Sequence, residues 1–296
     1  MKHYYNLDSI SYQECYKKLL DTEKWLNSKG IETKETRFEK ILENVKTINE
    51  SFKSNTIDSM IKEKGNEVLW FSLLEAAPFE LICESFKNLK DHEIPRKKLK
   101  DILGGPFLPK EEEIGDSNVN TRNYLFELEL AAKLKSKGIN IIGFDDVKFE
   151  FESIDFIIEC KRIFSDKTVK SNVEKAYEQL KKQMNENKRG IIALSVEKIY
   201  KTDHLYFEAT EAETEIKINQ IIDSFIKENR KYWGNFIDIR IIGIFIVLKF
   251  IVIIKPRQLL TSGFQLAVLP LCTPKNLQYS DYDRLMALGN KLMNKS

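Results

Sequence analysis

The spacing of apolar positions divides the chain into two parts. Up to about residue 103, apolar residues recur three or four positions apart, as in YKKLLDTEKWL, which predicts amphipathic helices without intervening strands. Residues 104–116 (GGPFLPKEEEIGD) combine Gly, Pro and an acidic triplet, a pattern typical of a helix end followed by a connection. We therefore expect an all-helical N-terminal domain, a linker and a second domain, at residues 1–104, 105–116 and 117–296.

The second part alternates between helix and strand patterns. One helix is predicted from about Thr121 to Lys137 and another from Ser171 to about Asn187, with a strand after it. Three strands are predicted between the two helices, in INIIGF, VKFEF and IDFIIECK. This order favours an α/β fold with a mixed β-sheet flanked by helices.

One segment, Ile241 to Ile254 (IIGIFIVLKFIVII), is almost wholly apolar and tests whether the chain enters a membrane. As a helix it would span only about 21 Å, short of the ~30 Å hydrocarbon core, with Lys249 in its middle. Its many Ile and Val residues instead favour a strand buried on both faces. We expect no membrane association.

The composition agrees with a soluble globular protein, because 42% of the 296 residues are hydrophobic and the formal net charge is only +2. The four cysteines lie far apart in the sequence, and none has a histidine near it, so neither a disulfide framework nor a structural zinc site is expected. The first residues contain no apolar run typical of a signal peptide. These features together predict a cytoplasmic protein.

The triplet Glu-x-Lys occurs four times, but only one copy has apolar surroundings. The four copies begin at Glu32, Glu159, Glu186 and Glu215. Glu159-Cys160-Lys161 ends a run that reads as an interior strand, where Glu159 and Lys161 project from one face and Cys160 from the other. Burying such charges costs several kcal/mol each unless they pair or bind a ligand. A mutual salt bridge and a functional site both remain open as explanations.

Hairpin geometry supplies a second carboxylate. If VKFEF and IDFIIEC pair around a turn at Glu152-Ser153, the numbers of facing residues sum to 305, and Asp146 faces Glu159. Their β-carbons would lie about 4.5–5.5 Å apart, so both carboxylates could share one cation. The turn lacks the Gly or Asn that such hairpins prefer, and a slip of one residue would bring in Asp145 instead.

A third carboxylate is expected from the preceding helix. Glu127 has Leu130, Ala131 and Leu134 at i+3, i+4 and i+7, so it shares their apolar, sheet-facing side. Alternatively, Glu127 lies at the rim of this stripe and reaches solvent.

Three carboxylates and a lysine at one strand end indicate a magnesium site. Mg²⁺ is usually held by one or two carboxylates, water and substrate phosphate, and Asp146 and Glu159 would be its main ligands, with Glu127 as a further one. The metal would lower the pKa of a bound water and neutralise charge in the transition state. Lys161 would orient that water or stabilise a non-bridging oxygen. This chemistry is the hydrolysis of a phosphodiester.

From about Asn120 to Val196 the chain resembles the PD-(D/E)xK nuclease superfamily, the restriction-endonuclease-like group that includes Mrr-type enzymes. The matching residues are Phe126-Glu127, Asp146, Ile158-Glu159-Cys160-Lys161-Arg162 and Gln179. The resemblance implies an α-β-β-β-α-β core and Mg²⁺ as the usual cofactor, with Mn²⁺ as a substitute. The chain departs from the family pattern in Phe144-Asp145-Asp146, where no proline precedes the aspartate.

The resemblance also assigns roles. Asp146, Glu159 and Lys161 match the metal-binding and catalytic positions. Glu127 matches the acidic residue often found on the first helix, and Gln179 the glutamine that some branches carry on the second, so both join the expected catalytic set. The implied activity is that of a deoxyribonuclease, an endonuclease in restriction or anti-phage defence.

Basic residues accumulate after the Glu-x-Lys strand. From Cys160 to Arg189 there are nine Lys or Arg against four Asp or Glu, in a chain that is otherwise almost neutral. Such a stripe fits a polyanionic partner such as DNA, although a solvated helix face also explains it. The residues expected to bind DNA are Arg162, Lys170, Lys175 and Lys182.

Two functions remain open at this point. The first is a metal-dependent DNA nuclease whose helical domain mediates homo-oligomerisation or binds a partner protein. The second is a catalytically inactive nuclease-fold module for DNA binding or assembly. The intact Asp, Glu and Lys set favours the nuclease, because an inactive descendant would have no need for charges at a costly position.

Overall fold

The computed structural model describes residues 1–108, 111–112, 119–200, 202–234, 236–255, 259–271 and 279–293. The chain forms two compact units. Unit 1 comprises Met1–Asp8, Lys133–Leu259 and Gly263–Ser296, and unit 2 comprises Ser9–Ala132 and Leu260–Ser262. The linker predicted at residues 105–116 stays a prediction, and the limits of the two compact units fall elsewhere in the chain.

Unit 2 is built from helices, as the spacing of its apolar residues predicted. They are α1 (Tyr12–Ser28), α2 (Arg37–Lys53), α3 (Ile57–Lys64), α4 (Asn66–Phe86), α5 (Arg96–Asp101) and the larger part of α6 (Val119–Ser136). The side chains of Ser11 and Thr36 cap α1 and α2 by accepting hydrogen bonds from backbone N–H groups of the first turn. The rings of Phe38 on α2 and Phe79 on α4 pack edge to face in the core, with centroids 5.0 Å apart.

A network of buried charges ties the helices of unit 2 together. Arg37 of α2 and Arg122 of α6 both bind the carboxylate of Glu75 on α4, at 2.6 and 2.5 Å. Arg122 also pairs with Glu112 at 2.9 Å and donates to the carbonyl of Phe107 at 2.7 Å. The described part of the predicted linker is therefore fastened to α6, whereas residues 109–110 and 113–116 lie outside the described residues.

The first strand corrects the prediction that residues up to about 103 form only helices. Residues Lys2–Ser9 form β1, which pairs with β8 (Leu259–Pro270) at one edge of the sheet in unit 1. The hydroxyl of Tyr4 donates to the carbonyl of Met286 at 2.9 Å, another contact with the distant end of the chain. Such pairing depends on residues more than 200 positions away, which the local apolar spacing does not encode.

Unit 1 contains an eight-stranded mixed sheet, which confirms the predicted α/β class. Its order is β1-β8-β7-β5-β4-β3-β2, and β6 pairs with β7. The strands not yet given are β2 (Asn140–Gly143), β3 (Val147–Phe151), β4 (Ile154–Arg162), β5 (Lys188–Ser195), β6 (Tyr206–Ala209) and β7 (Ile241–Ile254). Strands β2, β3 and β4 form an antiparallel meander, and β5 and β7 continue it in parallel.

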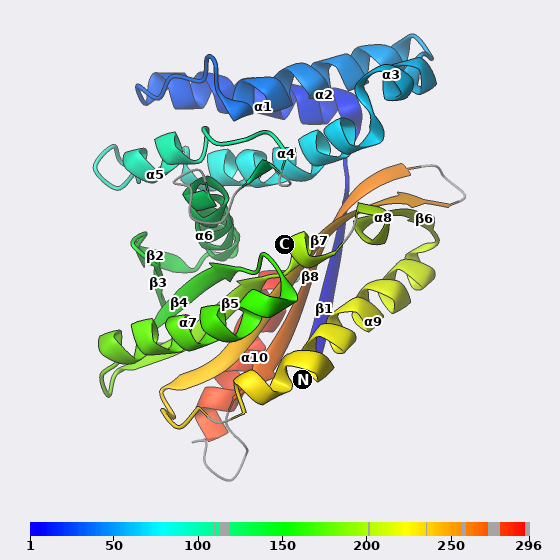
Figure 1. The fold of residues 1–296 in the computed structure, drawn as a ribbon. Coiled ribbons are helices and arrows are strands. Elements are labelled where there is room, and N and C mark those ends of the chain that lie inside the picture. Colours follow the sequence, from blue (N-terminus) through cyan, green and yellow to red (C-terminus); the bar gives the residue numbers. More distant parts are fainter. Residues whose placement is uncertain are drawn as a thin grey trace. The chain divides into compact units, whose positions relative to one another are not determined.

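Helices cover both faces of this sheet. Figure 1 shows α7 (Val169–Gln183) and α9 (Glu211–Asn229) in front of it and α10 (Tyr279–Met293) behind it, and a short α8 (Thr202–Leu205) precedes β6. Two glycines allow α7 and α10 to approach the sheet closely. A β-carbon on Gly190 would lie 3.3 Å from Leu180 of α7, and one on Gly243 only 2.5 Å from Leu285 of α10. Since side chains alternate between faces along a strand, these contacts identify which residues point toward α7.

The apolar segment Ile241–Ile254 is strand β7, as predicted, and almost all of its residues are buried. It pairs with β5 along its first half and with β6 along its second. Within the described part of the chain, no helix has the length and apolar character needed to cross a bilayer.

Candidate functional site

Strands β3 and β4 form a hairpin in the predicted register. Val147 pairs with Ile158 and Phe151 with Ile154, so the numbers of facing residues sum to 305. The turn residues Glu152 and Ser153 adopt φ angles of 50° and 62°, in the left-handed region that Gly or Asn would favour. The rings of Phe149 and Phe156 stack across the hairpin, with centroids 5.3 Å apart. The register prediction is confirmed.

This register brings Asp146 to Glu159. Asp146 lies in the turn before β3, one position beyond the last ladder pair and opposite Glu159. It is half-buried and its charge acts on Glu159, whereas Asp145 is exposed. Which of the two aspartates binds a metal stays a prediction. Lys161 Nζ donates to Glu159 Oε1 at 2.5 Å, which agrees with the prediction that both side chains share one face of β4.

That face is the one covered by α7. Glu159 lies in register with Ile192 of β5, and Gly190, two positions earlier on the same face, packs beneath Leu180 of α7. Glu159 and Lys161 therefore lie on the helix-covered side of the sheet. This position explains why Glu159 is only 4% exposed although it is charged in water.

The environment makes the Glu159 carboxylate unusually basic. Burial raises its pKa to about 7, and the hydrogen bond and positive charge of Lys161 oppose this shift. The negative charge of Asp146 and a hydrogen bond between the two carboxyl groups add to it. Glu159 Oε2 is buried and has no hydrogen-bond partner. An unsatisfied buried acceptor costs about 1–3 kcal/mol, so this oxygen would gain from a cation.

The helix α7 brings a glutamine to the site, but not the one selected from the sequence. Gln183 Nε2 donates to Asp146 Oδ2 at 2.8 Å. Gln179 lies one turn earlier, and its Oε1 is buried without a hydrogen-bond partner. The sequence carried no signal that distinguishes the two, because their order along the sheet depends on how α7 crosses it. The catalytic role predicted for Gln179 stays a prediction.

Glu127 lies on α6 in unit 2, where it pairs with Lys98 of α5. The ammonium group of Lys98 is also 5.2 Å from the ring centroid of Tyr124. Among the described residues, no group of three or more His, Cys, Asp or Glu is arranged to hold a metal ion. The carboxylates that the structure brings together are therefore Asp146 and Glu159, and the metal role of Glu127 stays a prediction.

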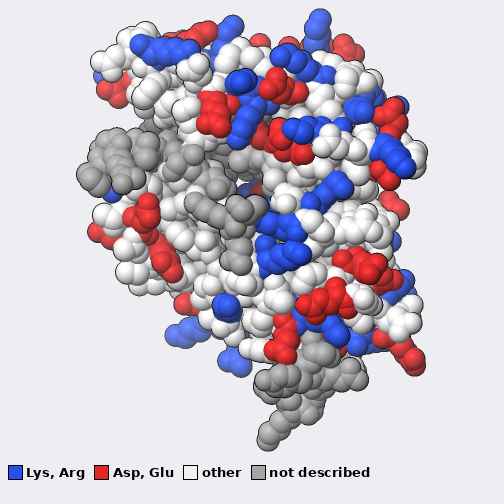
Figure 2. Space-filling model, turned by 180° about the vertical axis from the view of Figure 1, so that it is seen from behind, with Lys and Arg blue, Asp and Glu red and all other residues white. Residues whose placement is uncertain are grey.

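The residues expected to bind DNA have mixed surroundings. The guanidinium of Arg162 lies 5.2 Å from the ring centroid of Phe164. On α7, Lys170 approaches Glu174 at 3.8 Å, and Lys175 and Lys182 are exposed. On the other face of the molecule, away from α7, Figure 2 shows acidic and basic side chains interspersed. DNA binding by the four predicted residues stays a prediction.

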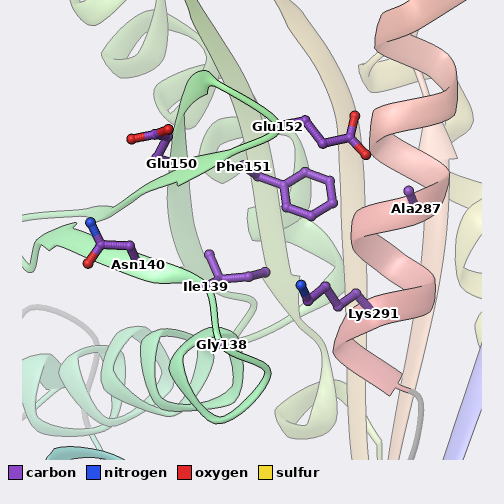
Figure 3. A pocket seen from close by; sticks show the side chains of 8 residues that line it. All are labelled: Gly138, Ile139, Asn140, Glu150, Phe151, Glu152, Ala287 and Lys291. Carbon is purple, nitrogen blue, oxygen red and sulfur yellow. The ribbon is translucent and has the colours of Figure 1, made fainter.

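A cavity of about 570 Å³ lies at the turn end of the hairpin, away from Asp146. Figure 3 shows Phe151 and Glu152 of the hairpin and Lys291 of α10 among the side chains that line it. None of its lining residues is a predicted site residue. Since Asp146 precedes β3 and this cavity adjoins the last residues of β3, the two features are separate.

Stability is expected to fall as the pH rises from about 4.5 to 7, in part because of Glu159. Its pKa rises from an ordinary value of 4.5 to about 7 in the folded state, mainly through burial, so the folded protein keeps a proton that the unfolded chain releases in this window. Burial raises the pKa of Glu80 to about 7 as well, so Glu80 also makes stability fall as the pH rises through this window. Urea unfolding across this range should show a shallower pH slope for Glu159→Gln and the shallowest for Glu159→Gln combined with Glu80→Gln. A pH slope for Glu159→Gln equal to that of wild type would contradict the raised pKa of Glu159.

The site thus combines the carboxyl groups of Asp146 and Glu159 with the amine of Lys161, at facing positions of the hairpin, and one oxygen of the Glu159 carboxyl is buried without a hydrogen-bond partner. Such a set of groups can hold a divalent cation beside a positively charged group. This capability alone does not identify a function. Comparisons with protein-family models, curated proteins and solved structures find no match to this chain.

Proposed function

We propose that this protein is a metal-dependent nuclease that hydrolyses DNA phosphodiester bonds, with Asp146, Glu159 and Lys161 at its catalytic centre. The observation that carries the proposal is Glu159 Oε2, a buried carboxylate oxygen without a hydrogen-bond partner. It lies on a side chain held between Asp146 and Lys161. A bound divalent cation would compensate the cost of burying this group, and Mg²⁺, or Mn²⁺ in its place, accepts such oxygen ligands.

The order of elements around the site supports the same proposal. The chain runs α6, β2, β3, β4, α7, β5, which is the α-β-β-β-α-β order of a restriction-endonuclease-like core. Both carboxylates are placed by the central hairpin of this order. The assignment to that fold family, and a role in restriction or anti-phage defence in the cytoplasm, belong to the proposal and rest on the resemblance.

The side chains have separable roles in hydrolysis. Mg²⁺ bound by the Asp146 and Glu159 carboxylates would supply a water of lowered pKa and neutralise charge on the phosphate. Lys161 holds its ammonium group next to the Glu159 carboxylate, where it orients the attacking water or stabilises a non-bridging oxygen. The cover of α7 lowers the local dielectric constant, which strengthens both electrostatic effects.

Exposed lysines on α7 support DNA as the substrate. Lys175 and Lys182 lie on the helix that covers the site. Arg162 follows Lys161 on β4 and, because side chains alternate along a strand, projects from the other face, so it does not add to this support. Positive groups near a catalytic centre hold phosphates in position without reading their sequence. The helical unit 2 would serve in self-association or in binding a partner protein.

The test is cleavage of supercoiled plasmid DNA by the full chain. We expect nicked or linear products with Mg²⁺ or Mn²⁺ and none in excess chelator, with activity restored when the metal is added back. DNA binding without cleavage under every metal condition would instead support the inactive module. Cleavage that continues in chelator would reject the metal centre.

A further inference from the structure

The last residue of α7, Gln183, contacts one of the proposed metal ligands, Asp146. Gln183 is half-buried, and its Nε2 donates to Asp146 Oδ2 at 2.8 Å. No pattern in the sequence distinguished Gln183 from its neighbours. It reaches Asp146 because α7 crosses the face of the sheet on which Glu159 and Asp146 lie.

The chemistry of this contact fixes its direction. A carboxylate only accepts hydrogen bonds, so the amide must present its N–H side to Asp146. Occupying Oδ2 restrains the plane of the carboxyl group. A turn residue such as Asp146 otherwise has rotational freedom that a metal site would have to remove upon binding.

We propose that Gln183 is a positioning residue that orients Asp146 for the divalent cation. This inference rests on the proposed nuclease function, and it assigns to Gln183 a contact that the resemblance had assigned to no residue. Partners that orient metal ligands typically change metal affinity by about 10- to 100-fold when they are removed. Gln183 touches the ligand and not the reacting atoms, so its loss should weaken metal binding more than the chemical step.

Gln179 differs from Gln183 in its hydrogen bonding. Its Oε1 is buried without a hydrogen-bond partner, whereas the Gln183 amide is joined to Asp146. The two residues lie one helical turn apart on α7, so a substitution that only destabilised this helix would have a similar effect at either position. The hydrogen bond to Asp146 therefore makes Gln183, and not its neighbour, the positioning residue.

Calorimetric titration of the full chain with Mg²⁺, without DNA, measures this role directly. We expect Gln183→Met, which keeps the side-chain length and removes the donor, to weaken Mg²⁺ binding by about 10- to 100-fold. In plasmid cleavage, the Mg²⁺ concentration for half-maximal rate should rise by the same factor. The rate at saturating Mg²⁺ should stay within a few-fold of wild type.

Glu178→Met provides the matched control, because Glu178 is exposed on the same helix. This variant should keep wild-type Mg²⁺ affinity. Equal affinities for Gln183→Met and wild type would overturn the inference while leaving the nuclease proposal intact. Wild-type protein that neither binds Mg²⁺ nor cleaves DNA would overturn the nuclease proposal itself. If Gln183→Met does not fold, as judged by its melting transition, Gln183→Leu replaces it in the same titration.

Discussion

Glu159→Gln is expected to reduce DNA cleavage by at least about 100-fold while leaving the protein folded. The amide preserves the size of the side chain and an acceptor for Lys161, but it removes the negative charge that a divalent cation requires. Burial already disfavours that charge in the folded protein. The variant should therefore unfold at the same or a higher urea concentration at neutral pH, which separates a loss of chemistry from a loss of structure.

Lys161→Ala should lower the cleavage rate to a similar extent, but by another route. Its loss removes the ammonium group beside Glu159 and leaves both carboxylates, so Mg²⁺ binding measured by calorimetry should persist. Glu215→Gln and Lys227→Ala, at exposed positions of α9, are matched controls that should cleave like wild type. Full activity in both Glu159→Gln and Lys161→Ala would reject the proposed centre.

Glu75→Ala is expected to destabilise unit 2 by about 3–5 kcal/mol. Glu75 neutralises two buried arginines, Arg37 and Arg122, whose side chains are 0% and 5% exposed. Removing the shared carboxylate leaves both positive charges buried and without their central counter-ion. The free energy of unfolding, measured by urea denaturation and followed by far-UV circular dichroism, reports the change.

Two further variants test the cause of this loss. Glu84→Ala removes an exposed partner of Lys87 and should change stability by no more than about 0.5 kcal/mol. A quadruple variant, Arg37→Met with Glu75→Leu, Glu112→Leu and Arg122→Met, removes all four buried charges of the network and should recover much of the stability that Glu75→Ala loses. A quadruple variant as unstable as Glu75→Ala would show that volume, and not uncompensated charge, determines the effect.

The sequence predicted the core of the candidate site because that part depends on local geometry. The spacing of VKFEF and IDFIIEC and the period of two along a strand were enough to set Asp146 opposite Glu159. The Ile and Val content of residues 241–254 likewise predicted β7. In both cases the relevant partners lie within one strand or one hairpin.

Other features depend on contacts that no local pattern contains. The prediction selected Gln179, but the rotation and crossing of α7 bring Gln183 to Asp146. Glu127 has the expected apolar neighbours, yet its carboxylate pairs with Lys98, 29 positions earlier in the chain. The Arg37, Glu75 and Arg122 network joins three helices and an apparent linker, and each residue alone reads as an ordinary surface charge.

The position of β1 beside β8 has a consequence for synthesis of the protein. Strand β1 leaves the ribosome long before its partner strand β8, which ends at Pro270. At about 5–20 residues per second, β1 waits roughly 13 to 50 s for that partner. During this interval its backbone hydrogen-bonding groups are open to other nascent chains, so chaperones that shield exposed strands should associate with the growing polypeptide until β8 emerges.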